Sequence, residues 1–410
     1  MKIDNLKNKK ILIVGYGIEG KSTELFLKKN VSNAVIGITD KNDRLNYLDV
    51  QYEYDLVIKS PGVNKSDIHI PYTTATNIFF ANIQNPIIGV TGTKGKSTTA
   101  SLIHHILVAS GKKAHLVGNI GKPALELFMS SIGKDDIIVM ELSSYQLDDI
   151  CYSPHFVVIT SLFPEHMNYH GTVDLYYASK RNILSRVISN NTVFFNSKYQ
   201  QITEWIKDLS IKKVDVSNLL LDRIESQLIG KHNVENILLS YAVAKELGIT
   251  NSQIRNAIKT FKPLPHRLEK VGVYKEILFF NDAISTTPQS TIAAIESLKT
   301  VNTLLLGGQD RGYDFEQLMN CIVRNKITNL VFFPESGEKM YNVLKKRNTD
   351  IHFNILKTSK MDEAVSFAFQ YTKKDHICLL STASPSYSIW KNYIEKGELF
   401  KKYITEYEKK

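Results

Sequence analysis

Cysteine is scarce in this sequence, and long hydrophobic runs are missing from it. The 410 residues include three cysteines, Cys151, Cys321 and Cys378, which lie far apart without C-x-x-C spacing, so neither a disulfide framework nor a zinc site is indicated. No apolar run approaches the ~18 residues of a membrane-spanning helix, and the polar residues 1–10 do not have the pattern of an export signal. We therefore expect a cytoplasmic protein with no membrane association.

Clusters of one-signed charge are also missing, although the net charge is +10 at pH 7. Lysines are spread along the chain, and in the lysine-rich C-terminal stretch they are interleaved with Glu395, Glu398, Glu406 and Glu408. This pattern indicates solvated helix surfaces and an anionic substrate rather than binding of nucleic acid. With 43% hydrophobic residues, a chain of this length is expected to form two or three domains with their own cores.

The most informative segment that is present is a glycine-rich turn. A short apolar strand at 86–90 leads through this turn into Gly95-Lys96-Ser97 at the start of a helix. Backbone N–H groups and the helix N-terminus attract phosphate, the lysine reaches the terminal phosphates and the serine holds Mg2+. The residues predicted to bind nucleotide phosphates in this loop are Gly92, Thr93, Lys94, Gly95, Lys96, Ser97 and Thr98.

This turn is a relative of the common phosphate loop. The pattern G-x-x-x-x-G-K-[ST] requires a glycine where this chain has Val90. A helix is predicted after the turn, because Leu102, Ile103 and Ile106 recur on one face and Gly111 ends the pattern. An incidental glycine turn is the alternative, but it leaves the adjacent lysine and serine unexplained.

Strands and helices alternate along the chain, which predicts an α/β fold with parallel sheets covered on both faces. The first unit opens with a strand at 11–14, continues with Gly15-x-Gly17-x-x-Gly20 and a helix, and ends its second strand at Asp40. This pattern is typical of a dinucleotide-binding turn with an acidic residue for a ribose. A tight turn without a ligand explains it equally well.

A second unit has polar residues at the ends of two predicted strands. Glu141 follows the strand at 136–140, where ligands of open α/β sheets gather, and could hold the Mg2+ that Ser97 also contacts. A helix-capping or turn acid is the alternative. His166 and His170 lie in the loop after the strand at 156–160, and their pairing beside this site favours metal binding over solvated side chains.

A third unit begins after the proline-punctuated segment 263–267, which indicates a domain boundary. Strands predicted at 277–280, 303–306 and 376–380 are each followed by a polar cluster. Ligands of such sheets bind at the carboxyl ends of the strands, so we expect a ligand surface along one edge of this sheet.

Seven motifs, in order along the chain, resemble those of the Mur ligases. They are Gly-Val-Thr-Gly-Thr-Lys-Gly-Lys-Ser at 89–97, Gly-Asn-Ile-Gly at 118–121, Glu-Leu-Ser-Ser-Tyr-Gln-Leu at 141–147, Pro-Glu-His at 164–166, Tyr-x-x-x-Lys at 176–180, His-Asn-x-x-Asn at 232–236 and Pro-His-Arg at 265–267. Each motif alone has a real false-positive risk, whereas the ordered set spans essentially the whole chain.

The resemblance implies three domains: a Rossmann-like UDP-substrate domain over residues 1–85, a central P-loop-type ATPase domain over 86–264 and a Rossmann-like C-terminal domain over 265–410. It also implies a cytoplasmic monomer of peptidoglycan synthesis that joins glutamate to UDP-N-acetylmuramoyl-L-alanine with ATP and Mg2+. In this family the substrate carboxylate attacks the γ-phosphate, and the glutamate amine then attacks the resulting acyl phosphate.

The resemblance also implies roles for individual residues. Lys96, His166 and Lys180 match catalytic positions. The positions that hold Mg2+ match Ser97, Glu141, His166 and Lys180, the last as a carbamylated lysine. Nucleotide contacts beyond the loop match Asn236, Arg267 and Asp282. Substrate contacts match Gly15, Gly17, Asp40 and Ser60 at the UDP moiety, Asn119, and Ser381 and Tyr387 at glutamate.

The departures from the family pattern are concentrated in the C-terminal domain. Where the enzymes that add D-glutamate usually have Asp-Ser-Lys, this chain has Asp282-Ala283-Ile284, so the lysine is missing. Residues 309–312 and 380–387 are closer to a variant branch that adds L-glutamate, which stays open as an alternative to D-glutamate. A folylpolyglutamate-type ligase ranks lower, because it has no place for the N-terminal unit. A nicotinamide oxidoreductase and a non-catalytic nucleotide-binding module would both leave His166 unused.

Overall fold

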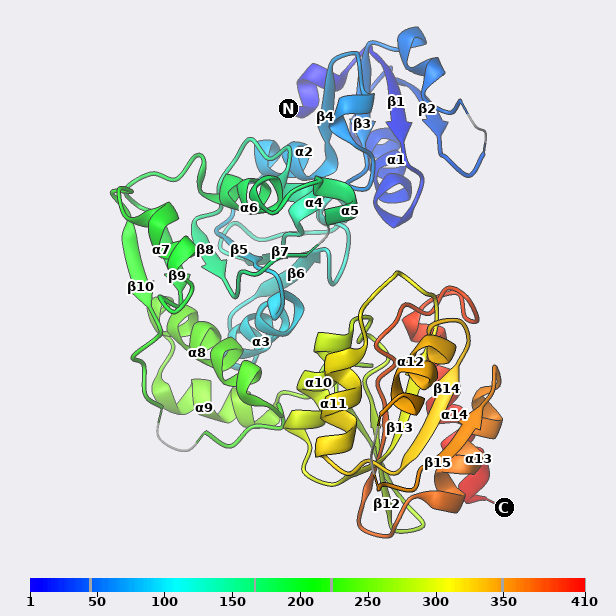
Figure 1. Cartoon of the computed structure of the whole chain (residues 1–410). Helices are drawn as coiled ribbons and strands as arrows, with labels where there is room; N and C mark the ends of the chain where they lie inside the picture. The colour runs from blue at the N-terminus through cyan, green and yellow to red at the C-terminus, as the bar shows by residue number, and fades with distance from the viewer. Residues whose placement is uncertain (44–45, 166, 222–223, 348–349, 410) are drawn as a thin grey trace. The chain divides into compact units, whose positions relative to one another are not determined.

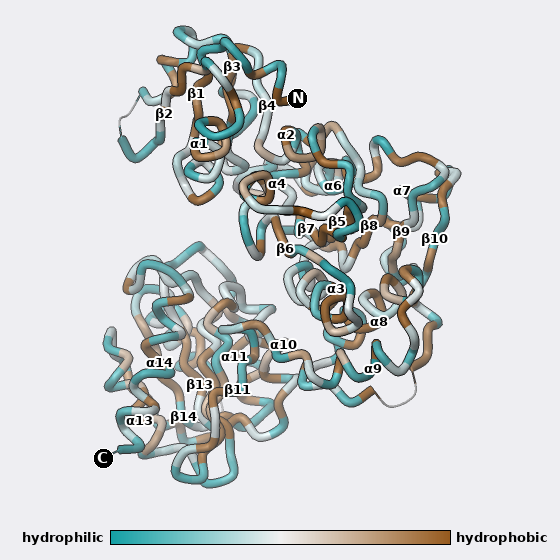
Figure 2. Tube along the Cα trace, turned by 180° about the vertical axis from the view of Figure 1, so that it is seen from behind, coloured by the Kyte–Doolittle hydropathy of each residue, from teal (hydrophilic) through white to brown (hydrophobic). Residues whose placement is uncertain are grey.

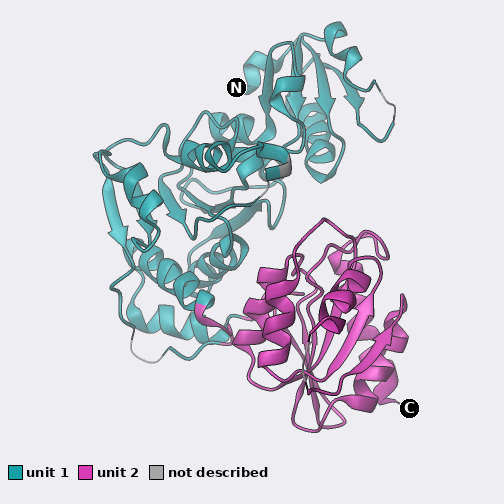
Figure 3. Cartoon of the chain, viewed as in Figure 1, with its two compact units in different colours: residues 1–226, 232–261 teal, residues 227–231, 262–410 magenta. Residues whose placement is uncertain are grey.

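The computed structural model describes residues 1–43, 46–165, 167–221, 224–347 and 350–409. The chain forms two compact units (Figure 3): unit 1 comprises residues 1–226 and 232–261, and unit 2 comprises 227–231 and 262–410. Within the described ranges, unit 1 contains two parallel sheets and unit 2 a third sheet that is mostly parallel, so the predicted α/β class is confirmed. The predicted domain boundaries at 85/86 and 264/265 stay predictions.

The N-terminal sheet of unit 1 has the strand order β2-β1-β3-β4 (Figure 1). β1 is central, and its residues 11–14 are buried, as expected of a strand covered on both faces. The elements here, with η for 3-10 helices, are η1 (Ile3–Leu6), β1 (Lys10–Val14), α1 (Ile18–Asn30), β2 (Val35–Thr39), η2 (Asp49–Glu53), β3 (Leu56–Lys59), η3 (Lys65–Asp67), β4 (Tyr72–Thr74) and α2 (Ala75–Asn82).

The second sheet of unit 1 has the order β10-β9-β8-β5-β7-β6. β5 lies between β7 and β8, with Val90 paired with Glu141 and Thr91 with Ile159, so the loops after these three strands meet at one edge. The elements are β5 (Ile87–Thr91), α3 (Lys96–Ala109), β6 (Ala114–Gly118), η4 (Ala124–Met129), β7 (Ile137–Glu141), α4 (Ser144–Leu147), β8 (Phe156–Ile159), α5 (Met167–His170), α6 (Val173–Arg181), η5 (Asn182–Leu184), β9 (Thr192–Phe195), α7 (Gln200–Ile206), β10 (Lys212–Asp215), α8 (Lys231–Glu246) and α9 (Asn251–Thr260).

The sheet of unit 2 has the order β11-β12-β16-β13-β14-β15 and is parallel except at β11. The sequence analysis missed this edge strand, which a hairpin joins to β12 through Lys275 and Glu276, both with positive φ. The elements are β11 (Glu269–Tyr274), β12 (Ile277–Asn281), α10 (Pro288–Ser297), β13 (Val301–Gly307), α11 (Glu316–Arg324), β14 (Asn329–Phe333), α12 (Ser336–Lys345), β15 (Asn354–Lys357), α13 (Met361–Tyr371), β16 (Ile377–Leu380) and α14 (Tyr393–Glu408).

Each unit has its own core, and Figure 2 shows hydrophobic residues along strands such as β1 and β7. In unit 1, the Phe128 ring lies 5.5 Å from that of Phe26 and 5.6 Å from that of Phe79, which ties α1 and α2 to η4. In unit 2, neighbouring residues of β13 pack into separate clusters, as the alternation of a strand requires. In the part of the chain that the structure describes, no helix has the length and apolar character to cross a bilayer.

Candidate functional site

The predicted phosphate loop joins β5 to α3, and two of its glycines are required by the backbone. Gly92 and Gly95 have φ of +143° and +89°, a region that side chains disfavour. A Cβ atom on Gly92 would lie 2.1 Å from Thr160 Oγ1, and one on Gly95 would lie 2.3 Å from Asn236 Oδ1. These close approaches explain why a glycine-rich turn occurs here.

The end of β8 holds the loop in shape. Thr93 N donates to Ser161 O at 2.8 Å, and Lys94 N donates to Ser161 Oγ at 2.9 Å. Thr160 Oγ1 donates to Lys94 O at 2.6 Å. The sequence analysis did not single out Thr160 and Ser161, although two hydroxyl residues directly after a buried strand are a usable signal.

The two lysines of the loop differ in their surroundings. Lys96 Nζ donates to Thr93 O at 2.8 Å, whereas Lys94 Nζ forms an ion pair with Glu165. Ser97 and Thr98 occupy the first turn of α3, where backbone N–H groups are open to an anion. The loop thus has the charge and the backbone geometry of a phosphate cradle.

Glu141 ends β7 at the same edge and is 1% exposed. Asn119 Nδ2 donates to Glu141 Oε1 at 3.0 Å, because Gly118 of β6 pairs with Glu141. Among the described residues, the buried Oε2 atom has no hydrogen-bond partner. A buried carboxylate oxygen without a partner is costly, which makes it a fitting ligand for a cation.

Lys180 of α6 is 1% exposed and lies at the same loop. Its Nζ donates to Gly92 O at 2.8 Å and lies 4.9 Å from the centroid of the Tyr176 ring. Burial, followed by the nearby positive charge of Lys96, lowers the pKa of Lys180 well below its ordinary value. Burial therefore favours the neutral, nucleophilic form of this amine compared with an exposed lysine.

The other predicted metal ligand, His166, lies outside the described residues. His170 is described: it is buried, and its Nε2 lies 3.1 Å from Ser144 Oγ. Within the described ranges, no group of three or more His, Cys, Asp or Glu side chains is arranged to hold a metal ion. Of the predicted metal ligands, Ser97, Glu141 and Lys180 lie among the described residues.

Asn236 lies against the phosphate loop from α8. It is 4% exposed, and its Oδ1 accepts from Thr99 Oγ1 at 3.2 Å. Its Nδ2 donates to Asn233 Oδ1 at 2.9 Å. The structure therefore brings this predicted nucleotide contact beside Gly95, although the two are far apart in the sequence.

The predicted UDP-binding residues meet at the carboxyl edge of the N-terminal sheet. Ser60 Oγ donates to Gly15 O at 2.6 Å, and a Cβ on Gly15 would lie 2.8 Å from Ser60 Cβ. Asp40 Oδ2 accepts from Tyr16 N at 2.7 Å, which fixes the turn, and Gly17 caps α1 at an exposed position. The backbone of Asn42 first, and then that of Tyr16, donates to Asp40 and lowers the pKa of this carboxyl.

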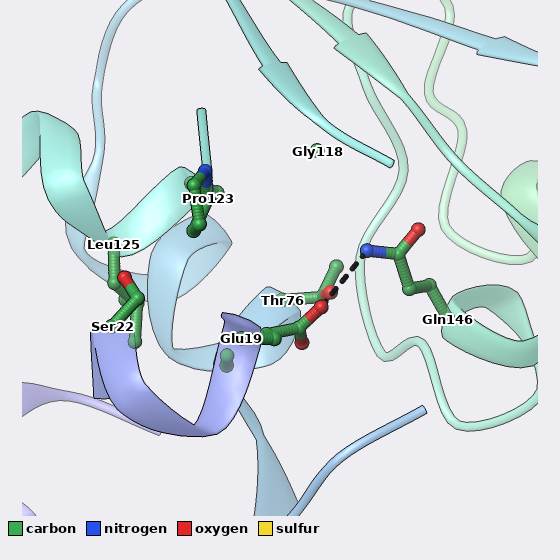
Figure 4. Close-up of a pocket in the computed structure, with 9 residues that line it drawn as sticks. Glu19, Ser22, Thr76, Gly118, Pro123, Leu125 and Gln146 are labelled. Atoms are coloured by element: carbon green, nitrogen blue, oxygen red, sulfur yellow. Dashed lines mark hydrogen bonds between the residues drawn. The ribbon is translucent and has the colours of Figure 1, made fainter. Parts of the chain in front are cut away.

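A small pocket lies in unit 1 between α1, α2, α4 and the loop after β6 (Figure 4). Its volume is about 10 Å³, room for one water molecule. Gln146 Nε2 donates to Glu19 Oε2 at 3.3 Å, while Glu19 Oε1 and Ser22 Oγ are buried without partners among the described residues. Burial raises the pKa of Glu19 to about 7. The lining includes Gly118, which directly precedes Asn119.

The remaining predicted site residues belong to unit 2. Asp282, after β12, is buried, and its Oδ2 accepts from Ser285 Oγ at 2.5 Å and from Ser381 Oγ at 2.9 Å. Burial raises the pKa of Asp282 to about 6, against the opposing effect of the hydrogen bonds from Ser285 and Ser381. Tyr387, in contrast, is 63% exposed. The structure thus joins Asp282 to Ser381 in one buried cluster and leaves Tyr387 at the surface.

Comparison with known proteins agrees with this geometry. Residues 90–221 match the model of the Mur ligase middle domain. The UDP-N-acetylmuramoylalanine--D-glutamate ligase of Enterococcus faecalis is 31% identical over 450 residues, and that of Streptococcus thermophilus is 30% identical over 449 residues, each alignment covering 97% of both chains. The chain belongs to the Mur ligase family.

Solved structures of other Mur ligases have a fold similar to that of this Mur ligase. The MurF ligase from Thermotoga maritima in complex with ADP has a TM-score of 0.65 at 14% identity, and the alignment covers 99% of this chain and 97% of that one. The UDP-N-acetylmuramate-alanine ligase MurC from the same organism has a TM-score of 0.63 at 16% identity, with 98% and 99% covered. The fold expected from the motifs is therefore confirmed.

Proposed function

We propose that this Mur ligase joins D-glutamate to UDP-N-acetylmuramoyl-L-alanine at the expense of ATP, through an acyl phosphate, in peptidoglycan synthesis. The observation that carries the proposal is that the phosphate loop, Glu141 and Lys180 meet at one sheet edge. The full-length relatives of the chain are named UDP-N-acetylmuramoylalanine--D-glutamate ligases, which supports the same reaction. The proposal includes a monomeric enzyme in the cytoplasm, where ATP is available.

The phosphate loop would bind the β- and γ-phosphates of ATP. Its backbone N–H groups, the first turn of α3 and the Lys96 ammonium all offer positive charge to them. Because Lys96 donates to Thr93 O in the structure, phosphate binding would exchange that backbone acceptor for phosphate oxygens. Lys94 would add a cation at the mouth of the loop.

The donor set fits Mg2+. Glu141 presents the unpartnered Oε2 atom and Ser97 a hydroxyl, and Mg2+ is commonly held by one or two carboxylates together with substrate phosphates and water. Bound there, the ion would neutralise phosphate charge that develops during transfer. Asn119 orients the Glu141 carboxylate by donating to Oε1.

Lys180 would act after carbamylation. Burial lowers its pKa and so favours the unprotonated amine, which would attack CO2 to form a carbamate and release one proton. The product is an anion beside Gly92, suited to a second cation with His166. NMR with 13C-labelled bicarbonate should detect a carbamate carbon that disappears in Lys180→Ala, and no such signal in the active enzyme would contradict the assignment.

The reaction needs charge neutralisation and alignment. An oxygen of the alanyl carboxylate attacks the γ-phosphorus, and ADP leaves. The neutral glutamate amine then attacks the acyl carbon, and the amide forms as the nitrogen loses one proton and inorganic phosphate, which takes up that proton, departs with the carboxylate oxygen. Residues of the loop and Lys180 would hold the reacting groups in place, which is where most of the rate gain in phosphoryl transfer arises.

The stereochemistry of the amino acid is the finer part of the proposal. The relatives are D-glutamate ligases by name, which favours D-glutamate, while the missing lysine after Asp282 keeps L-glutamate as the second candidate. The test is phosphate release from ATP with Mg2+ and UDP-N-acetylmuramoyl-L-alanine, in parallel with D- and L-glutamate. Turnover with D-glutamate alone is expected, turnover with L-glutamate alone would select the variant, and silence with both would refute the proposal.

A further inference from the structure

Helix α14 carries a lysine into the interior of unit 2. Lys396, Phe400 and Ile404 lie on one helix face and are all 0% exposed. The neighbouring Gly397 lets the helix come close to the sheet, since a Cβ there would lie 2.2 Å from His266 Nδ1. Asn281, at the end of β12, donates through Nδ2 to Gly397 O at 3.4 Å. The sequence analysis expected the lysines of this stretch to be solvated, and for Lys396 that expectation is wrong.

The Lys396 side chain reaches the segment that follows β16. Its Nζ donates to Thr382 Oγ1 at 2.6 Å, and Thr382 Oγ1 donates in turn to Ser384 O at 3.0 Å. Thr382 and Ser384 are both 0% exposed, and Ala383 between them has a positive φ of 55°. The relay therefore holds a bent backbone directly after Ser381.

Lys396 also brings positive charge to a place that is poor in counter-charge. In the described part of the chain, the partners of Nζ are Thr382 Oγ1 and the Trp390 ring, whose centroid lies 5.7 Å away, and neither carries a negative charge. Asp282 acts on it from a greater distance, and the oxygens of Asp282 already accept from Ser285 and Ser381. Burial lowers the pKa of Lys396 to about 7, so its charged form is weakly held in the free protein and an anion beside Nζ would stabilise it. Groups of this kind gather at functional sites.

We propose that Lys396 is a positioning residue for the amino-acid substrate, fixing the 381–387 segment through Thr382 and attracting a carboxylate of the incoming dicarboxylic amino acid. It supplies, from α14, the cation that the Asp282-Ala283-Ile284 loop lacks. This inference rests on the proposed function, because it assumes that the carboxyl edge of this sheet receives glutamate.

The test compares full-length variants. Lys396→Met removes the charge at similar length, Lys396→Arg keeps the charge, and Lys402→Met removes an exposed lysine of the same helix as the control. For each variant we would measure the KM for glutamate, the KM for ATP, kcat and the thermal midpoint. Isothermal titration calorimetry with glutamate, in the presence of ADP and Mg2+, adds a readout that needs no turnover.

The proposed role of Lys396 predicts an effect on glutamate that is not shared by ATP. Lys396→Met should raise the KM for glutamate about tenfold to a hundredfold, the cost of losing a charged hydrogen bond, while the KM for ATP stays near that of the wild type. Lys396→Arg should recover most of the loss, and Lys402→Met should change nothing. An unchanged KM for glutamate in Lys396→Met, or an equal rise in both KM values, would overturn the inference.

Failure of the proposed function can be told apart from failure of this inference. If the wild type releases no phosphate with either glutamate isomer, the proposed function fails. Calorimetry then decides the role of Lys396: binding of glutamate to the wild type with loss in Lys396→Met upholds it. Equal binding to both proteins, or no binding to the wild type, overturns it.

Discussion

Asn119, directly after β6, donates to Glu141 Oε1 at the end of the neighbouring β7 at 3.0 Å, while Glu141 Oε2 is buried without a hydrogen-bond partner among the described residues. We expect Glu141→Gln to lower kcat by about a hundredfold or more, because a charged ligand is lost.

Asn119→Ala should weaken Mg2+ binding about tenfold to a hundredfold by releasing the carboxylate. Activity measured against Mg2+ concentration checks both, and unchanged curves would exclude this site for the ion.

The phosphate loop offers a matched pair of glycine substitutions. Gly95 and Gly111 lie at opposite ends of α3 with φ of +89° and +83°, but an added Cβ collides with Asn236 in the first case and meets open space in the second. Gly111→Ala should lose about 1 to 2 kcal/mol of unfolding free energy from backbone strain, and Gly95→Ala should lose more, because its Cβ also collides with Asn236. Gly95→Ala alone should also lose ATP binding, measured by calorimetry. Equal ATP affinity in the two variants would contradict the close fit.

A buried ion pair ties the N-terminal sheet to the segment after α4 within unit 1. Lys59 Nζ lies 2.6 Å from Asp149 Oδ2, with the side chains 0% and 3% exposed. Asp149→Asn should lower the free energy of unfolding by about 3 to 5 kcal/mol, because it leaves the buried ammonium of Lys59 without its carboxylate. Asp148→Asn removes the neighbouring exposed pair with Lys65 and should cost less than about 1 kcal/mol.

Urea unfolding of both variants measures this difference. If Asp149→Asn proves as mild as Asp148→Asn, the Lys59 pair contributes little to stability. The double variant Lys59→Met with Asp149→Leu should recover most of the loss, since apolar residues of similar volume commonly replace a buried pair without cost.

Glu19 should make stability depend on pH. Burial raises its pKa from 4.5 to about 7, so between pH 4.5 and 7 the unfolded chain releases a proton that the folded chain keeps. Stability from this group therefore falls as the pH rises through that range and is constant above it. Glu19→Gln should raise the free energy of unfolding by about 1 to 2 kcal/mol at pH 8 and leave it unchanged at pH 4.5. The expected gain is smaller than the full pKa shift would give, because the residue is partly exposed.

Urea unfolding at the two pH values checks this expectation. Glu53→Gln, at an exposed position of η2, is the control and should show no such difference. A Glu19→Gln variant with the same stability difference from the wild type at both pH values would mean that the carboxyl titrates normally.

The sequence predicted best what depends on local pattern. The strand, glycine turn and helix around Lys96 follow from apolar periodicity and from residues suited to positive φ, and the structure has them at β5 and α3. The placement of Glu141 beside that loop followed from the rule that carboxyl ends of parallel strands share an edge.

What the sequence could not reveal depends on packing between distant segments. Lys180 stood out through the family motif alone, and its burial against Gly92 arises from the way α6 packs on the loop. Lys396 looked like one surface lysine among many, although its spacing of four from Phe400 and eight from Ile404 puts it on the buried face. Strand β11 was missed because its hairpin has no glycine or asparagine at the turn.

The most direct test of the proposed chemistry follows one oxygen atom. UDP-N-acetylmuramoyl-L-alanine with 18O in its alanyl carboxylate would be incubated with the enzyme, ATP, Mg2+ and D-glutamate, and the released phosphate analysed by mass spectrometry. An acyl phosphate requires one 18O atom in each phosphate formed. Phosphate that carries no 18O, released alongside the amide product, would contradict the mechanism.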